Sequence, residues 1–328
     1  KEDNIIYNKL YIMCTGIFLK TIQNEYIFSR TLEFGMPFNW YQLCNNNIIG
    51  TVGILPNMDT GYITDGVNKE GLLVATFFYP HYNQEYSKSK DNNKLNLYTG
   101  NLNKYLLENC NNIEEVIEKI KNLNILETRL GGELFSLHWA VCDKSGRFIV
   151  LEVKDRELIY YENKVNVITN SPTFPEHLKN LKNYNYLSKY SNPNSMSQGT
   201  GALGLPGDSS SKSRFVRANF YRKNMPLPNS SKEGMSSLLR VMHDFDIPEG
   251  SVVDEKTNQT EVTQYTVVYS INKFKMRYAN YGNVMGKNKR WQQSKMPVVL
   301  CAKFINNIIP FILIGISFSS YYIIFQKK

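Results

Sequence analysis

The sequence predicts an α+β domain in which antiparallel sheets lie inside and helices pack on their outer faces. Short β-type runs follow one another through most of the chain and do not alternate regularly with helical segments. Residues 71–79 (GLLVATFFY) form a nearly continuous apolar run, long enough for a strand that is buried on both faces. Strands without regular helix alternation favour antiparallel sheets covered by helices.

The first half of the chain supplies several predicted strands and one helix. Residues 14–21 and 24–32 are β-type runs around a short polar turn, and residues 48–55 and 62–65 continue the pattern. Residues 111–123 (NNIEEVIEKIKNL) have apolar side chains at 113, 116, 117 and 120. This is helical spacing, and an asparagine at 112 is a suitable N-cap.

The second half adds two hairpins, a short strand, a helix and a loop. Asp143-Lys-Ser-Gly146 is a turn sequence between two β-type runs and predicts a hairpin. The other predicted elements are a strand at 165–169, an amphipathic helix at 234–242 and a late hairpin at 264–271 and 274–278. Residues 191–207 are rich in Asn, Ser, Gly and Pro and predict a long loop, a kind of segment that often has a function.

Charge is distributed unevenly along the chain. The 328 residues, 42% of them hydrophobic, are enough for one large core or two modest ones. The net charge is +9, but seven basic residues and no acidic residue follow position 283, so the body carries only +2. A nearly neutral body argues against nucleic acid as a partner.

Cysteine and histidine spacing excludes several classes of site. The five cysteines are far apart and form no C-x-x-C pair, so we expect neither a disulfide framework nor a thiolate zinc site, and we expect a reducing, cytoplasmic compartment. The four histidines lack metal-binding spacing, and the glycine-rich segment 199–208 matches neither common phosphate-binding pattern. We therefore expect no metal, no nucleotide and no other cofactor.

The two ends of the chain differ from its body. Residues 1–13 are charged throughout, lack the apolar run of a signal peptide and end in Met13, so we expect a leader that is removed or is not part of the mature chain. Residues 284–328 form a basic and apolar tail. Within it, residues 308–325 carry no charge and are flanked by basic residues, which makes them a candidate membrane anchor or, alternatively, a buried terminal element or an altered chain end.

Cys14 is a candidate nucleophile because of its position directly after Met13. A lone cysteine on an apolar strand is usually a packing residue. A cysteine at a new N-terminus, however, carries both a thiol and a free α-amino group, and the amine's pKa of about 7.7–8.0 allows it to accept the thiol proton. No histidine base is then needed. The alternative is a papain-like thiol hydrolase in which one of the four histidines is the base.

Three further residues could serve this chemistry. Arg30 and Glu33 either form an edge-strand ion pair worth less than about 1 kcal/mol, or place a cation near the thiol and a carboxylate near the new ammonium. Asn170 follows an apolar strand and precedes a proline turn. It is either a turn residue or a donor to a developing oxyanion, a role worth about 3 kcal/mol elsewhere.

Seven short motifs, taken in order, resemble the choloylglycine hydrolase family, which contains bile salt hydrolases and penicillin V acylases. They are Cys14-Thr-Gly, Ser29-Arg-Thr-Leu-Glu33, Asp65-Gly-Val-Asn-Lys-Glu-Gly-Leu72, Leu137-His-Trp139, Thr169-Asn-Ser-Pro-Thr-Phe174, Gly204-Leu-Pro-Gly-Asp208 and Ser213-Arg-Phe215. The resemblance implies a four-layer αββα sandwich of the N-terminal-nucleophile hydrolase type over residues 14–283. It also implies hydrolysis of a non-peptide linear amide, a small-molecule substrate and a homo-oligomer.

The resemblance also implies roles at matching positions. Cys14 matches the nucleophile and its amine the base, and Arg30 matches the arginine beside the thiol. Asn170 matches the oxyanion-hole asparagine, and Arg214 the second active-site arginine.

Two positions depart from the family. Glu33 stands where the family usually has aspartate. Phe78 stands where bile salt hydrolases have asparagine and penicillin V acylases have tyrosine, although its backbone N–H can still serve the oxyanion hole. Phenylalanine shifts the expected substrate away from bile salts and towards an apolar or aromatic acyl group. These departures also leave open the alternative that the chain is a catalytically silent, membrane-attached relative that acts as a binding protein. His138 is expected to have a structural role.

Overall fold

The computed structural model describes residues 12–34, 39–54, 61–80, 85–130, 133–191, 194, 199–255 and 258–280. Apart from its last two residues, the predicted leader lies outside this part of the chain, as do the predicted tail and its candidate anchor at 308–325. Among the described residues, no helix has both the length and the apolar character needed to cross a membrane.

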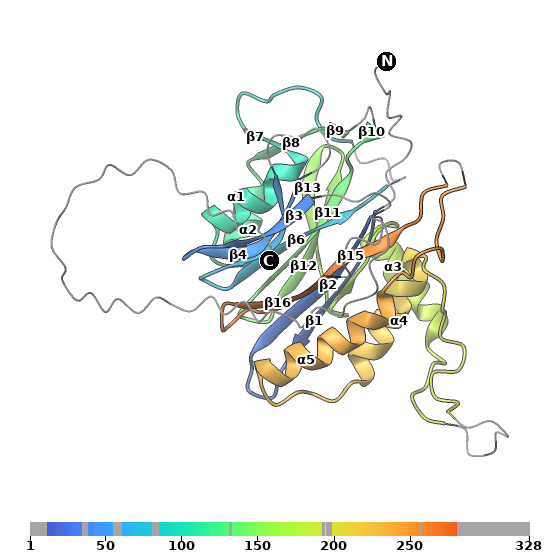
Figure 1. Ribbon diagram of the computed structural model, residues 1–328. Coiled ribbons are helices and arrows are strands. Elements are labelled where there is room, and N and C mark those ends of the chain that lie inside the picture. The colour runs from blue at the N-terminus through green and yellow to red at the C-terminus, as the bar shows by residue number, and fades with distance from the viewer. Residues whose placement is uncertain are drawn as a thin grey trace, which may run out of the picture.

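Two antiparallel sheets face each other at the centre of the molecule (Figure 1). One has five strands in the order β14-β1-β2-β15-β16, and the other has seven in the order β13-β12-β11-β6-β5-β4-β3. The five are β1 (Ile12–Lys20), β2 (Tyr26–Phe34), β14 (Val167–Ile168), β15 (Val262–Ser270) and β16 (Lys275–Asn280). The seven are β3 (Asn39–Cys44), β4 (Ile48–Ile54), β5 (Tyr62–Asn68), β6 (Leu72–Phe78), β11 (Leu137–Asp143), β12 (Phe148–Lys154) and β13 (Glu157–Glu162).

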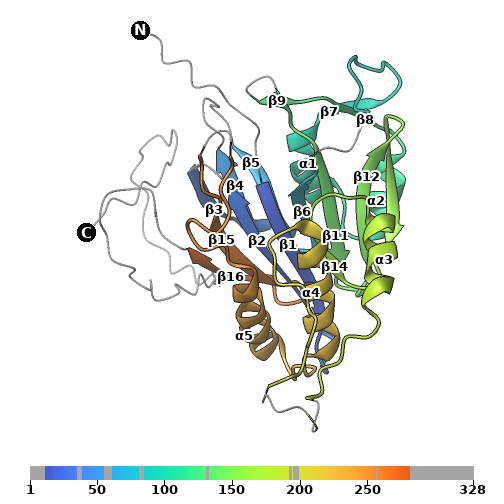
Figure 2. The same cartoon turned by 90° about the vertical axis from the view of Figure 1, so that its right-hand side faces the viewer.

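Helices cover the outer face of each sheet (Figures 1 and 2). The seven-stranded sheet is covered by α1 (Leu102–Asn109) and α2 (Ile113–Ile120), and the five-stranded sheet by α4 (Ser211–Asn224) and α5 (Ser231–Met242). Helix α3 (Phe174–Leu181) packs against α4. Smaller elements are the pair β7 (Leu95–Tyr98) and β8 (Leu123–Leu126), the pair β9 (Arg129–Leu130) and β10 (Glu133–Leu134), and 3₁₀ turns at Thr99–Asn101, Lys182–Tyr184 and His243–Phe245. The four layers have the predicted αββα order.

The apolar run at 71–79 is a central strand that is buried on both faces, as predicted. Leu73 and Phe77 of β6 belong to the core that reaches from between the two sheets to α4 and α5. Leu72 and Val74, on the opposite face, belong to the core beneath α1 and α2. Because successive side chains of a strand point to opposite faces, one continuous apolar run contributes to both cores.

Several local predictions are confirmed. The Asn112 side chain accepts a hydrogen bond from the backbone N–H of Glu115 at 2.9 Å and caps α2. The hairpins β11–β12 and β15–β16 form at the predicted turns. Cys14, Cys110 and Cys142 carry free thiols, whereas Cys44, contrary to the expectation of unpaired cysteines, takes part in a disulfide bond.

Candidate active site

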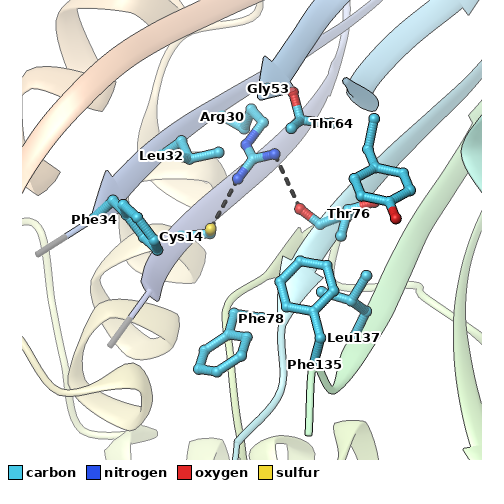
Figure 3. Close-up of a pocket in the computed structure, with 11 residues that line it drawn as sticks. Cys14, Arg30, Leu32, Phe34, Gly53, Thr64, Thr76, Phe78, Phe135 and Leu137 are labelled. Carbon is cyan, nitrogen blue, oxygen red and sulfur yellow. Dashed lines mark hydrogen bonds between the residues drawn. The ribbon is translucent and has the colours of Figure 1, made fainter. Parts of the chain in front are cut away.

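Cys14 lies in β1, and its side chain is 1% exposed. Strand β1 runs between β14 and β2, where Cys14 pairs with Leu32. The Nη2 of Arg30, on the neighbouring strand, donates to the Cys14 sulfur at 2.8 Å. Figure 3 shows the Arg30 guanidinium between this sulfur and Thr76 of the facing sheet. A cation in direct contact with a sulfur favours the thiolate.

Arg30 is fully buried but well supplied with acceptors. Its Nη1 donates to the Thr76 carbonyl at 2.9 Å and pairs with the Asp65 carboxylate at 3.2 Å, and its Nε donates to the Thr31 carbonyl at 3.2 Å. Burial lowers the pKa of Arg30, but the anionic groups around it more than offset that effect. The guanidinium therefore stays charged beside the thiol.

The Cys14 thiol is held by donors yet strongly desolvated. Burial raises its pKa above the ordinary value, although Arg30, Arg214 and a hydrogen bond from the Phe78 backbone N–H each lower it. Burial prevails, so the thiol needs an adjacent base before it can react as a thiolate.

Two buried histidines contact the backbone beside the site. The Nε2 of His138 is 2.8 Å from the Thr169 carbonyl oxygen, and the Nε2 of His177 is 2.8 Å from the Asn170 carbonyl oxygen. His177 also stacks on the ring of Phe215. Both imidazoles thus support the segment that presents Asn170, and this placement agrees with the structural role predicted for His138.

Asn170 connects β1 to the facing sheet. Its Oδ1 accepts from the Cys14 backbone nitrogen at 2.8 Å and from Arg214 Nη2 at 2.7 Å. Its Nδ2 donates to the Phe78 carbonyl oxygen at 2.8 Å. The amide therefore lies against both the nitrogen of Cys14 and the strand end that carries the predicted oxyanion donor.

Arg214 reaches the site from the first turn of α4 and is 2% exposed. Its Nη1 donates to the Cys14 carbonyl oxygen and, at 2.9 Å, to Thr15 Oγ1. Burial lowers its pKa, and Glu33 is the strongest of the groups that counteract this shift. Arg214 thus binds the backbone of Cys14, whereas Arg30 binds its sulfur.

Glu33 lies on the opposite face of β2 from Arg30 because three residues separate them. It pairs in register with Met13, and its Oε1 accepts from Thr263 Oγ1 at 3.3 Å. Its Oε2 is buried without a hydrogen-bond partner in the described part of the chain, and burial raises its pKa to about 8. The hypothetical ion pair with Arg30 is replaced by the Arg30–Asp65 pair.

A small apolar cavity opens at the Cys14 sulfur. It encloses about 60 Å³ and is walled mainly by aromatic and aliphatic side chains. Around Cys14 and Arg30, it is lined by Leu32, Phe34, Gly53, Tyr62, Thr64, Thr76, Phe78, Phe135 and Leu137 (Figure 3). We call this cavity the floor of the site. Such a floor suits an apolar group better than a polyhydroxylated one.

The structure gathers the predicted site residues around Cys14. Arg30, Asn170, Arg214 and Phe78 touch it directly, and Glu33 lies across the strand. The contact between Asp65 and Arg30 was missed from the sequence. The described residues hold no cluster of His, Cys, Asp and Glu suited to a metal ion.

The chain is similar to known proteins over most of its length. A model of the linear amide C–N hydrolases, choloylglycine hydrolase family, matches residues 14–296. An uncharacterized protein of Paramecium bursaria Chlorella virus 1 is 35% identical over 83% of this chain and 98% of its own length. A bile salt hydrolase/transferase of Clostridium perfringens is 30% identical over 83% of this chain and 90% of its own.

Solved structures show the same fold. A mutant conjugated bile acid hydrolase from Clostridium perfringens matches with a TM-score of 0.71 and 28% identity, over 83% of this chain and 90% of its own. A penicillin V acylase from Agrobacterium tumefaciens matches with a TM-score of 0.63, over 81% and 83% of the two chains; at 20% identity this supports the fold alone. These likenesses confirm the predicted N-terminal-nucleophile type of αββα sandwich. The chain belongs to the choloylglycine hydrolase family of linear amide C–N hydrolases.

Proposed function

We propose that the chain is a cysteine amidase whose nucleophile is Cys14, exposed as the first residue of the mature protein. One observation carries the proposal: both reactive atoms of the same residue are held in place. Arg30 binds the sulfur at 2.8 Å, and Asn170 binds the backbone nitrogen at 2.8 Å. A free amine at that nitrogen would be the base that the desolvated thiol requires.

The reaction then follows from the positions of these atoms. The α-amine takes the thiol proton, and the sulfur attacks the amide carbonyl carbon to form a tetrahedral intermediate. Its oxyanion is bound by the Phe78 N–H, which now bonds to the sulfur, and by the Asn170 Nδ2, which now donates to the Phe78 carbonyl. The ammonium protonates the leaving amine. Water, activated by the same amine, then hydrolyses the thioester and releases the acid.

Glu33 balances the charge that maturation creates. Its register partner is Met13, so the bond whose loss generates the amine lies beside this carboxylate. While Met13 is attached, burial raises the pKa of Glu33 to about 8 and the carboxyl is mostly protonated at neutral pH. An ammonium on Cys14 would lower that pKa and ionise Glu33. The glutamate, although longer, can thus balance the charge of the ammonium in place of the aspartate that is usual in the family.

The apolar lining of the cavity favours a substrate whose acyl group is apolar or aromatic. The rings of Phe78 and Phe135 lie 6.3 Å apart in its wall. The relatives are named for bile salts and for penicillin V, and we propose a substrate closer to the second class, because the floor is narrow and apolar.

Three further proposals rest on the sequence and, for the homo-oligomer, on the family resemblance. The catalytic unit is residues 14–283, the mature protein is a cytoplasmic homo-oligomer, and residues 308–325 of the tail attach it to a membrane.

The mechanism is tested by mass spectrometry of the purified chain together with a hydrolysis panel of penicillin V, conjugated bile salts and N-acyl homoserine lactones. We expect an active chain that begins at Cys14, an inactive Cys14→Ala variant and a preference for penicillin V over bile salts. An active chain that retains residues 1–13 would overturn the N-terminal mechanism. Activity in Cys14→Ala would overturn the nucleophile.

A further inference from the structure

A buried carboxylate with several hydroxyl partners lies behind Arg30. Asp65 Oδ2 accepts from Tyr265 at 2.7 Å and from Thr64 at 3.3 Å, in addition to the contact with Arg30 Nη1 at 3.2 Å. Asp65 Oδ1 accepts from the Tyr269 hydroxyl. The carboxylate and both tyrosines are 0% exposed. This cluster is outside the proposed reaction, which does not use it.

The two tyrosines reach Asp65 because of strand register. Val267 of β15 pairs with Arg30 of β2, and Tyr265 and Tyr269 lie two residues to either side of it. Side chains two apart on a strand share a face, so both hydroxyls project beside Arg30 into the space between the sheets. Burial first, and Asp65 second, raise the pKa of both tyrosines well above the ordinary value, so both remain hydrogen-bond donors.

An arginine and a carboxylate left to themselves favour a forked contact, in which two guanidinium nitrogens bind the two oxygens. Here the Asp65 oxygens are engaged by hydroxyls, Nη1 supplies the contact to Asp65, and Nη2 points to the Cys14 sulfur at 2.8 Å. Asp65 and a thiolate at Cys14 therefore compete for one cation.

We propose that Tyr265 and Tyr269 are positioning residues that keep Asp65 from forming a forked contact with Arg30, so that Nη2 is left for the Cys14 sulfur. This inference rests on the proposed role of Cys14 as the nucleophile. Without the two hydroxyls, both Asp65 oxygens turn to the guanidinium and Nη2 is drawn away from the sulfur. Neither tyrosine lines the acyl cavity, so its aromatic and aliphatic wall is unchanged.

The test compares Tyr265→Phe, Tyr269→Phe and the double variant with the mature parent chain. Phenylalanine keeps the ring at 265, which packs against Trp40 with centroids 4.9 Å apart. The rate of iodoacetamide alkylation of Cys14 is followed against pH by peptide mass spectrometry, which separates it from the thiols of Cys110 and Cys142. We expect the thiol pKa of the double variant to rise by about one unit, which is roughly a tenfold loss of thiolate at neutral pH. In addition, kcat should fall while KM stays unchanged.

Two controls make the result specific. Tyr221→Phe removes a tyrosine hydrogen bond to another carboxylate, that of Asp244, and should leave the alkylation profile unchanged. In an Asp65→Asn background no carboxylate competes for Arg30, so the tyrosine substitutions should no longer shift the thiol pKa. An unchanged or lowered thiol pKa in the double variant, or the same shift in the Asp65→Asn background, would overturn the inference. Alkylation is measured without turnover, so this failure is distinct from finding Cys14→Ala active.

Discussion

Arg30 and Glu33 are three residues apart on β2, and their side chains occupy opposite sides of the five-stranded sheet. On the side that faces the other sheet, Arg30 is matched by Asp65, by two backbone carbonyls and by the Cys14 sulfur. On the side that faces the helices, Glu33 has a weak hydrogen bond from Thr263 and, among the described residues, one oxygen without a hydrogen-bond partner. On the inner side, the buried cation of Arg30 is paired with an anion. On the helix side, the carboxyl of Glu33 is largely neutral because burial raises its pKa.

Under the proposed maturation, the two faces would change differently. Glu261 is a second buried carboxyl near Arg214, and burial raises its pKa to about 7. Loss of Met13 would add a positive charge next to Glu33. The inner face would need no such change, because Arg30 already contacts the sulfur. In the proposed mechanism, the donors to the thiol are therefore in place beforehand, and removal of residues 1–13 would create only the amine.

Replacing Arg30, the cation on the inner face, should have the largest combined effect on stability and activity. Arg30→Met leaves Asp65 buried without its charged partner, and breaking a buried pair in this way costs about 3–5 kcal/mol. We expect a loss of that size in the free energy of unfolding, measured with urea at neutral pH, together with the loss of activity. Arg147→Met is the matched control, because Arg147 pairs with Glu162 at the surface, where ion pairs are worth less than about 1 kcal/mol. Equal losses in the two variants would contradict the inner-face interpretation.

Glu33 should give the chain that retains residues 1–13 a pH dependence of stability. Its pKa is raised to about 8 from an ordinary 4.5, so the stabilising neutral form is lost as pH rises through this window. At about 1.4 kcal/mol per pKa unit, the expected decline is on the order of 5 kcal/mol. Glu33→Gln should flatten it, and the mature chain should show less of it, as measured by urea unfolding from pH 4 to 9.

Glu25 supplies a control of opposite sign. A hydrogen bond from Lys273 and others from Ser231 lower its pKa to about 2, so its contribution is present above pH 4.5 and is lost as pH falls. Glu25→Gln should therefore change the acid limb of the same curve and leave the limb above pH 5 unchanged. A Glu33→Gln chain with an unaltered neutral limb would show that Glu33 is not the carboxyl responsible.

Much of the strand pattern could be predicted from the sequence because strand periodicity and turn chemistry are local. Helices α1, α3 and α4 were not predicted, and α4, which carries Arg214, shows one reason. The side of α4 that packs against the sheet buries Arg214 and Arg217 together with Phe215. Charged residues on the packed face break the apolar periodicity by which amphipathic helices are predicted.

The site was predicted less completely on the face of β2 that lies between the two sheets. Family resemblance indicated the residues around Cys14, but nothing in the spacing of Arg30 and Glu33 showed that Asp65 would be the partner of Arg30. That pairing joins β2 to the facing sheet, and the tyrosines join it through the register of Arg30 with Val267. Register between strands more than 200 residues apart is fixed by the packed core and is not written in local sequence.

His177 should cause a loss of stability in acid that is smaller than the loss expected from Glu33 at higher pH. Its pKa is lowered to about 4 from an ordinary 6.5, mainly by burial, so the folded chain excludes a proton that the unfolded chain binds. Stability is therefore lost as pH falls from 6.5 to 4, by about 3 kcal/mol. His177→Gln can still donate to the Asn170 carbonyl and should shrink this loss, whereas His243→Gln, on the surface, should not. Thermal unfolding across this range distinguishes them, and identical curves for the two variants would exclude His177 as the source.

The smallest expected change in stability is the difference between substitutions of two threonines of β15, both of which face the helices. Thr263 Oγ1 accepts from the Ile247 N–H at 2.9 Å and donates to Glu33, whereas Thr266 Oγ1 is buried without a partner among the described residues. Thr263→Val leaves a buried N–H and a carboxyl oxygen unbonded and should cost about 1–2 kcal/mol. Thr266→Val removes an unsatisfied hydroxyl and should be neutral or slightly stabilising. Urea unfolding of the two variants measures the difference; equal costs would mean that Thr263 contributes by packing alone and that Glu33 gains nothing from its hydroxyl.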